Sequence, residues 1–204
     1  MKKLYLSLLL LAVIGLSLGV FNKLNALNNV TPVPLAASNP NTAPQTLGAV
    51  QKPQDVSTPV SFTIPKLNVR SVTVESVGLD KEGKMDIPKD ENNVAWYNLG
   101  SKPGERGNSV IAAHYDKKSG EPAVFYEINK LQKGDELKVK AKDGQEYTYA
   151  VTEVKSYELA DFPLIEVFGV GDRARLNLIT CEGNYDKASK LYSHRLVVYS
   201  ELKT

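Results

Sequence analysis

Residues 136–154, ELKVKAKDGQEYTYAVTEV, decide the fold. Apolar and polar side chains alternate on both sides of Asp143-Gly144, and alternation with a period of two is typical of a strand with one buried face. An Asp-Gly pair readily takes the positive φ angles that a tight hairpin turn requires. The stretch therefore predicts two antiparallel strands joined by a short turn.

Similar short runs, rich in Val, Ile, Thr and Tyr, recur through residues 60–204 and are separated by Gly-bearing turns such as Lys102-Pro103-Gly104 and Lys133-Gly134-Asp135. The other runs are Ser61 to Ile64, Arg70 to Val77, Ser109 to Ala113, Arg175 to Thr180 and Leu196 to Tyr199. Repeated short strands with such turns predict an all-β barrel or sandwich. Helix should be scarce, and we expect one short helix within Ala123 to Leu131.

The N-terminus carries a candidate membrane anchor. Lys2 and Lys3 precede the uncharged, Leu-rich run from Leu4 to Phe21. As a helix this run would be about 27 Å long, which is close to the roughly 30 Å thickness of a bilayer core. Leu24-Asn25-Ala26 makes a poor cleavage site because of its bulky Leu. Residues 1–29 therefore predict an uncleaved signal anchor with a cytoplasmic N-terminus, a cleaved signal peptide being the alternative, and both export the rest of the chain.

A Pro-rich segment follows the predicted anchor. Thr31 to Pro59 contains six of the eleven prolines of the chain and no aromatic residue. Such a composition buries too little apolar surface to offset the entropy lost on ordering. We expect residues 30–59 to be a disordered linker that spaces the domain of residues 60–204 from the membrane.

Composition and charge exclude several classes of protein. The net charge is only +2, with no basic stripe, so nucleic acid is not an expected partner. A single cysteine excludes a disulfide framework and a zinc site built on paired cysteines. With only two histidines and no H-E-x-x-H spacing, we expect no metal and no cofactor.

Cys181 is the first candidate for chemistry. It directly follows the strand-like run Arg175 to Thr180 and precedes Glu182-Gly183-Asn184, which reads as a loop. A nucleophile at a strand end is held firmly on one side and is accessible on the other. The alternative is a buried and inert thiol, since free cysteine often behaves as a small hydrophobic residue.

His114 and Arg195 also border strand-like runs, and either one is alternatively an ordinary surface residue. A free thiol is only about 3% thiolate at pH 7, and a neighbouring imidazole raises that fraction. A fixed guanidinium would stabilise the oxyanion formed when a thiol attacks an amide. His194 alternates with Arg195 and should face away from it, so His114 is the preferred base.

Three segments together resemble motifs of the sortase family, the cysteine transpeptidases of the Gram-positive cell surface. They are Leu178-Ile179-Thr180-Cys181, Ser109-Val110-Ile111-Ala112-Ala113-His114 and Ser193-His194-Arg195-Leu196-Val197-Val198. The order His, Cys, Arg agrees with the family, and so do the spacings of 67 and 14 residues. The resemblance spans roughly Ser61 to Leu202.

The chain departs from the family pattern at Ala113, where glycine is frequent. Other positions lean toward classes D to F of the family rather than class A. These are Pro88, Ala95-Trp96-Tyr97, Pro103-Gly104 and Gly107.

The resemblance implies an eight-stranded β-barrel with one or two short helices and a transpeptidase mechanism. Cys181 would attack the Thr–Gly carbonyl of an LPxTG-like sorting signal and form a thioacyl-enzyme. His114 would protonate the leaving amine and activate the incoming one, Arg195 would bind substrate and the oxyanion, and Ala113 and Thr180 would line the substrate site. The acceptor would be an amine of a peptidoglycan precursor or a pilin, and the enzyme would be a single-pass protein of the cell membrane with an extracytoplasmic catalytic domain.

Other functions stay open at this point. The enzyme would be a thiol protease if water resolved the thioacyl group, and the domain would be a non-catalytic, anchored binding module if Cys181 were buried and unreactive. An L,D-transpeptidase is disfavoured, because Ile179-Thr180 precedes the cysteine where Ser-His-Gly is expected. The sequence leaves the sorting motif and the acceptor undetermined.

Overall fold

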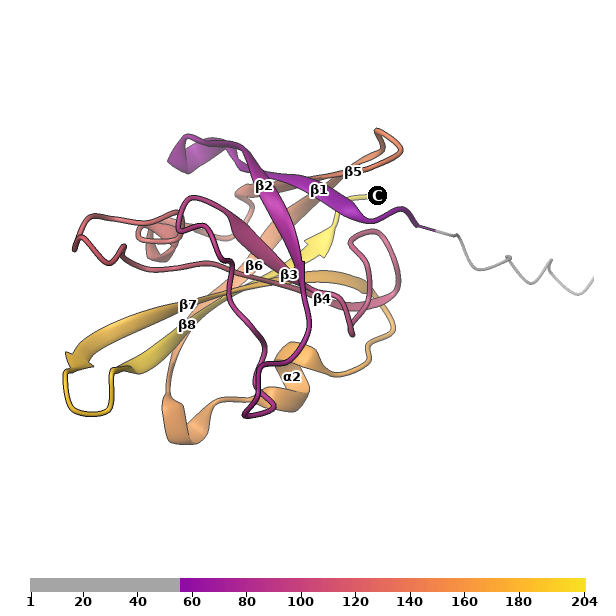
Figure 1. The fold of residues 1–204 in the computed structure, drawn as a ribbon. Helices are drawn as coiled ribbons and strands as arrows, with labels where there is room; N and C mark the ends of the chain where they lie inside the picture. Colours follow the sequence, from indigo (N-terminus) through magenta and orange to yellow (C-terminus); the bar gives the residue numbers. More distant parts are fainter. Residues whose placement is uncertain (1–55) are drawn as a thin grey trace, which may run out of the picture. The chain divides into compact units, whose positions relative to one another are not determined.

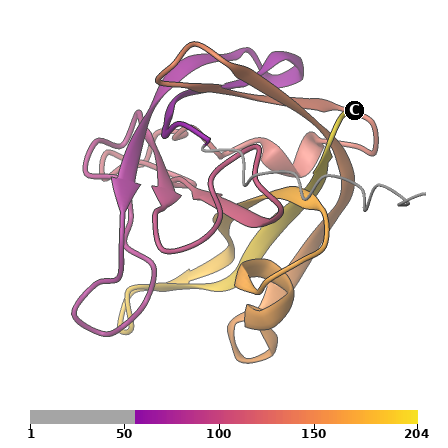
Figure 2. The ribbon, with the colours of Figure 1, turned by 90° about the vertical axis from the view of Figure 1, so that its right-hand side faces the viewer.

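The computed structural model describes residues 56–204, in which eight strands form one closed barrel (Figure 1). The strands are β1 (Pro59–Ile64), β2 (Val69–Val77), β3 (Val94–Tyr97), β4 (Gly107–Ala112), β5 (Glu136–Ala141), β6 (Glu146–Glu158), β7 (Ala174–Asp186) and β8 (Leu191–Leu202). Around the barrel they run in the order β1-β2-β3-β4-β7-β8-β6-β5, and β5 pairs with β1 to close it (Figure 2). The predicted eight-stranded, all-β architecture is confirmed.

The hairpin predicted from residues 136–154 is present as β5 and β6. These strands pair antiparallel from Glu136 opposite Ala150 to Lys140 opposite Glu146. Gly144 has a φ of 90° in the turn, a backbone conformation that glycine takes without the steric cost of a side chain. Local sequence is therefore sufficient to set this part of the barrel.

A parallel contact between β4 and β7 joins parts of the chain that are distant in sequence. The register runs from Gly107 opposite Ala174 to Ala112 opposite Ile179. The hydrogen bond from the Ala113 amide to the Ile179 carbonyl, at 3.2 Å, continues this register past the last residue of β4. The C-terminal end of β4 thereby lies beside the middle of β7.

Apolar side chains pack on both faces of this part of the sheet. The barrel interior is filled by fully buried side chains that include Phe62, Ile111, Tyr149 and Leu178. A second cluster on the outer face contains Val110, Val167, Ile179, Val197 and Tyr199. The strands β4, β7 and β8 therefore carry packed apolar side chains on both of their faces.

The short helix α2 (Leu164–Phe168) covers part of that outer face. The side-chain amides of two buried asparagines fix it there: Asn177 donates to the Val167 carbonyl at 2.8 Å, and Asn108 donates to the Glu166 carbonyl at 2.9 Å. Figure 1 shows α2 and the β2–β3 connection on the same side of β4 and β7.

The strands β7 and β8 are longer than predicted, which corrects the expected positions of two candidate residues. Glu182-Gly183-Asn184 was expected to be a loop, but β7 continues to Asp186, and β8 begins at Leu191 rather than at Arg195. The pairing is irregular between Glu182 and Tyr185, and Gly183 there has a φ of 86°. Gly183 thus marks an irregularity within the hairpin rather than the end of a strand, and Figure 1 shows this hairpin extending beyond the other strands.

The helical predictions also need correction. Only Ile128–Lys130 of the segment Ala123 to Leu131 is helical, as the single 3-10 turn η3. Phe125, Ile128 and Leu131 are all buried in the barrel core, and a spacing of three places side chains on one side of a 3-10 turn. Within residues 56–204, the other helical elements are α2 and the 3-10 turns η2 (Pro65–Leu67) and η4 (Leu159–Asp161).

The predicted anchor and linker, residues 1–29 and 30–59, lie almost wholly outside the described residues. Within residues 56–204, no helix combines the length and the apolar character needed to cross a bilayer.

Candidate active site

The register of three strands pairs two of the predicted catalytic residues and brings the end of β4, which precedes the third, to the same strand. Cys181 on β7 lies directly opposite Arg195 on β8. The β4–β7 register ends with Ala112 opposite Ile179, and the Ala113 amide bonds to the Ile179 carbonyl. If the same register continued for two more residues, His114 would lie beside Cys181. Side chains that are paired across neighbouring strands project from the same face of a sheet. The strand pairing therefore joins Cys181 and Arg195, and the meeting of His114 with them stays a prediction; the three residues are called the row below.

The row lies on the outer face of the barrel. Ile179 and Val197, one step along the same face of β7 and β8, belong to the outer apolar cluster. The Cys181 side chain is neither sealed in the core nor fully exposed, because it lies where this cluster gives way to the projecting hairpin. A half-buried thiol on an outer face is compatible with access by an extended peptide.

Burial and two neighbouring charges set the state of the thiol. Burial raises the pKa of Cys181 above its ordinary value, the Arg195 guanidinium lowers it, and the Asp116 carboxylate raises it. The net shift is upward, so the thiol is largely protonated at neutral pH. It needs a base to become a nucleophile.

The backbone of the hairpin holds the Arg195 guanidinium beside this thiol. Its Nη1 donates to the carbonyl of His194 at 2.9 Å and to that of Tyr192 at 3.5 Å. A guanidinium carries five N–H donors, so several remain for a substrate oxygen. Within residues 56–204, no carboxylate forms a salt bridge with Arg195.

The His114 ring is oriented by the β2–β3 connection. Its Nε2 lies 3.3 Å from the carbonyl oxygen of Pro88, a buried residue of that connection. A carbonyl oxygen only accepts hydrogen bonds, so this contact places a hydrogen on Nε2. Nδ1 is then the ring nitrogen that can take up and release a proton.

Ala113 and Thr180, the predicted substrate-binding residues, have buried side chains on the opposite face of their strands. Thr180 is 3% exposed, and its hydroxyl donates to the Ala113 carbonyl at 3.0 Å. The Cβ of Ala113 packs in the interior cluster, which explains how alanine replaces the frequent glycine. Both residues tie β4 to β7, and their role toward substrate stays a prediction.

The sequence prediction missed an aromatic and acidic group beside the row. The Tyr192 hydroxyl donates to the Asp116 carboxylate. The Tyr115 ring lies 5.6 Å from that of Tyr192 and 4.7 Å from that of Tyr126, and Tyr185 lies 5.1 Å from Tyr192. The signal available in the sequence was the position of Asp116, two residues after His114. The pairing of Tyr185 with Tyr192 is seen only in the structure.

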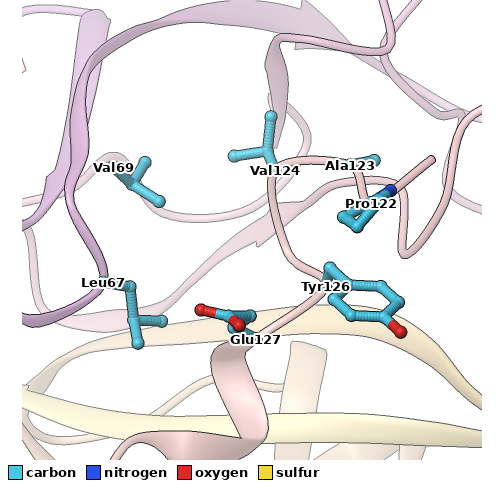
Figure 3. Close-up of a pocket in the computed structure, with 7 residues that line it drawn as sticks. All are labelled: Leu67, Val69, Pro122, Ala123, Val124, Tyr126 and Glu127. Atoms are coloured by element: carbon cyan, nitrogen blue, oxygen red, sulfur yellow. The ribbon is translucent and has the colours of Figure 1, made fainter.

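A shallow cavity of about 290 Å³ opens next to this tyrosine group (Figure 3). Leu67 and Val69 lie on one side of it, and the segment from Pro122 to Glu127 lies on the other. Its lining includes Tyr126 but no member of the row. The candidate site is therefore defined by the row of three side chains and not by this cavity.

The chemistry that the row offers is that of a thiol, an imidazole and a guanidinium. Across residues 56–204, no three His, Cys, Asp or Glu side chains are close enough together to hold a metal ion. The arrangement suits nucleophilic attack on a carbonyl, with an acid–base group on one side and an oxyanion donor on the other.

Comparisons with known proteins give the same picture of the fold. Residues 62–203 match the family model described as the sortase domain, whereas no curated protein matches the chain. Sortase C1 from Streptococcus agalactiae superimposes with a TM-score of 0.54 at 20% identity, over 71% of this chain and 67% of that one. The sortase D5 transpeptidase of Clostridium perfringens superimposes with a TM-score of 0.53 at 22% identity, over 75% of this chain and 82% of that one. Sortase A of Listeria monocytogenes superimposes with a TM-score of 0.53 at 22% identity, over 74% of this chain and 89% of that one. Classes C, D and A thus match about equally, and the leaning toward classes D to F stays a prediction.

Proposed function

The chain belongs to the sortase family and is therefore a cysteine transpeptidase, and we propose that Cys181, His114 and Arg195 form its catalytic site. One observation supports this assignment: Cys181 on β7 lies opposite Arg195 on β8, and β4, which ends two residues before His114, pairs with β7 up to Ile179. Cys181 and Arg195 are 14 positions apart in the chain, and His114 precedes Cys181 by 67 positions.

The proposed reaction begins with acylation of Cys181. The sulfur attacks the Thr–Gly carbonyl of an LPxTG-like sorting signal, while the thiol proton passes to Nδ1 of His114. The C–N bond of the tetrahedral intermediate then breaks, and His114 returns the proton to the leaving amine. Arg195 donates to the oxyanion through the N–H groups that the hairpin carbonyls leave unused.

A second amine completes the proposed reaction. His114 takes a proton from the incoming amine, the amine attacks the thioester, and the Cys181 thiol leaves with a proton. Enzymes of this family act in general on sorting signals and pilins, so we propose an amine of a peptidoglycan precursor or of a pilin as the acceptor. Residues 1–29 would anchor the enzyme in the cell membrane, and residues 30–59 would space the catalytic domain from it.

The decisive experiment is covalent capture of a sorting peptide. The protein is incubated with a small library of LPxTG-like peptides, and the intact mass is then measured. We expect an acyl adduct on the wild-type protein and none on Cys181→Ala. Retained turnover in Cys181→Ala would remove the thiol from the mechanism.

The two histidines provide a matched pair for the same assay. Nδ1 of His194 lies 2.7 Å from the Ser193 hydroxyl, and on β8 His194 is offset by one residue from Arg195. We expect His114→Asn to abolish adduct formation and His194→Asn to preserve it. The reverse pattern would assign the acid–base role to His194.

The alternatives give different products. With an added amine such as triglycine, a transpeptidase yields the ligated peptide, whereas a thiol protease yields only the free carboxylate. A binding module would give no adduct, and its thiol would resist a small alkylating agent. Product mass and alkylation rate together separate the three.

A further inference from the structure

Glu75 is a half-buried acid on β2 that the proposed chemistry does not use. Its Oε2 accepts from the Lys89 amide at 2.9 Å, and its Oε1 accepts from the Asp90 amide at 3.2 Å and from the Asn93 side-chain amide at 2.9 Å. The hydrogen bond from the Lys89 amide is the main cause that lowers the pKa of Glu75. One carboxylate thus holds three points of a single loop segment.

The loop segment that Glu75 holds, Pro88–Asn93, contacts the loop that follows His114. Pro88 directly precedes the anchored Lys89, is buried, and points its carbonyl at Nε2 of His114. At the other end of the segment, the Glu91 carboxylate accepts from the Lys118 amide at 3.1 Å. The His114 ring therefore meets a carbonyl whose position is fixed from β2.

We propose that Glu75 is a positioning residue, which fixes the Pro88 carbonyl so that His114 keeps its hydrogen on Nε2 and presents Nδ1 for proton transfer. The inference rests on the proposed role of His114. A hydrogen bond to one ring nitrogen of a histidine selects the tautomer and holds the ring plane. Supporting groups of this kind act by orienting the residue that does the chemistry.

The effect of removing Glu75 follows from this arrangement. Without the carboxylate, the Lys89 and Asp90 amides lose their acceptor, and the segment that carries the Pro88 carbonyl is free to shift. His114 would then populate both tautomers and several ring orientations. General acid–base catalysis contributes roughly 10²–10⁴-fold to a rate. We expect Glu75→Ala to lose part of this contribution, so that the acylation rate falls about tenfold while the KM of the peptide is unchanged.

The test combines kinetics with ¹⁵N NMR of the histidine rings. In the wild-type protein, the uncharged His114 ring should be the Nε2–H tautomer. In Glu75→Ala, it should be a mixture of the Nε2–H and Nδ1–H tautomers. His194 serves as the internal reference, because its ring contacts Ser193 and not the Glu75-anchored segment. Glu75→Gln retains one acceptor oxygen and the side-chain shape, so it should fold normally and give an intermediate loss.

Asp80 provides the matched control. It is an acid in the same β2–β3 connection, and its Oδ1 accepts from the amides of Glu82 and Lys84, both at 2.9 Å. Asp80→Asn should leave the acylation rate and the His114 tautomer unchanged. An equal loss in Asp80→Asn would show general loosening of the connection and would overturn the inference.

The outcomes also separate this inference from the proposed function. Unchanged rate and tautomer in both Glu75 variants, with an active wild-type enzyme, refute the positioning role alone. If His114→Asn instead keeps full activity, the catalytic role of His114 fails, whereas the tautomer measurement still tests the contact with Pro88.

Discussion

Thr180→Val tests whether the contact between β4 and β7 holds the candidate site together. The Thr180 hydroxyl is buried and donates to the Ala113 carbonyl at 3.0 Å. Valine keeps the shape and removes this donor directly beside His114 and Cys181. The substitution therefore isolates one hydrogen bond between the two strands that carry the acid–base group and the nucleophile.

The expected loss of stability follows from that hydrogen bond. A typical intramolecular hydrogen bond contributes about 1 kcal/mol, and a buried group left without a partner costs about 1–3 kcal/mol. We expect the free energy of unfolding to fall by about 2 kcal/mol. For a domain of this size, about 2–4 °C of melting temperature corresponds to each kcal/mol, so the melting temperature should fall by about 4–8 °C.

The assay is thermal unfolding together with peptide acylation kinetics. Thr180→Ser is the control: it retains the hydroxyl and loses one buried methyl, so it should cost only about 1 kcal/mol. If the hydroxyl serves only to join the strands, the KM of the peptide stays constant in both variants. An unchanged melting temperature in Thr180→Val together with a raised KM would refute this reasoning and assign the hydroxyl to substrate binding.

Three further substitutions test the site and the fold. Arg195→Lys should lower the acylation rate about a hundredfold, because an ammonium cannot replace the planar donors that face the oxyanion; near-normal kinetics would remove Arg195 from the mechanism. Asp116→Asn removes a charge that raises the pKa of Cys181, so the pH profile of thiol alkylation should move to lower pH; a move to higher pH would contradict this electrostatic account. Tyr149→Phe deletes the buried hydroxyl that accepts from the Gly104 amide at 2.7 Å and should lower the free energy of unfolding by about 1–2 kcal/mol in urea titrations; an unchanged midpoint would show that this hydrogen bond contributes little.

The sequence prediction missed two features of the fold, the strand β3 and the continuation of β7 through Gly183, and each miss has an identifiable cause. All of β3 except Tyr97 is buried, so Val94-Ala95-Trp96 shows no alternation of apolar and polar residues and gives no strand signal. Gly183 and Asn184 have the composition of a turn, yet the strand continues through them because Ser193 and Tyr192 on β8 supply partners. In both cases tertiary contacts override what local composition predicts.

The Glu75 contacts likewise had no counterpart in the sequence pattern. Glu75 lies 14 residues before Lys89 and 39 before His114, and nothing in the composition links the three. Asp116 and Tyr192 are 76 residues apart, and only the projecting hairpin brings them into contact. Contacts that two side chains make through a shared loop can be identified only from the three-dimensional structure of that loop.

By itself the sequence determined the all-β class, the hairpin at Asp143-Gly144 and, through the order of three short motifs, the family. These are local properties, because strand alternation and turn geometry depend on residues close together in the chain. Tertiary structure alone decided that Cys181 lies opposite Arg195 and that the end of β4 lies beside β7, since parallel pairing of β4 with β7 joins distant segments in a register that neither segment specifies by itself.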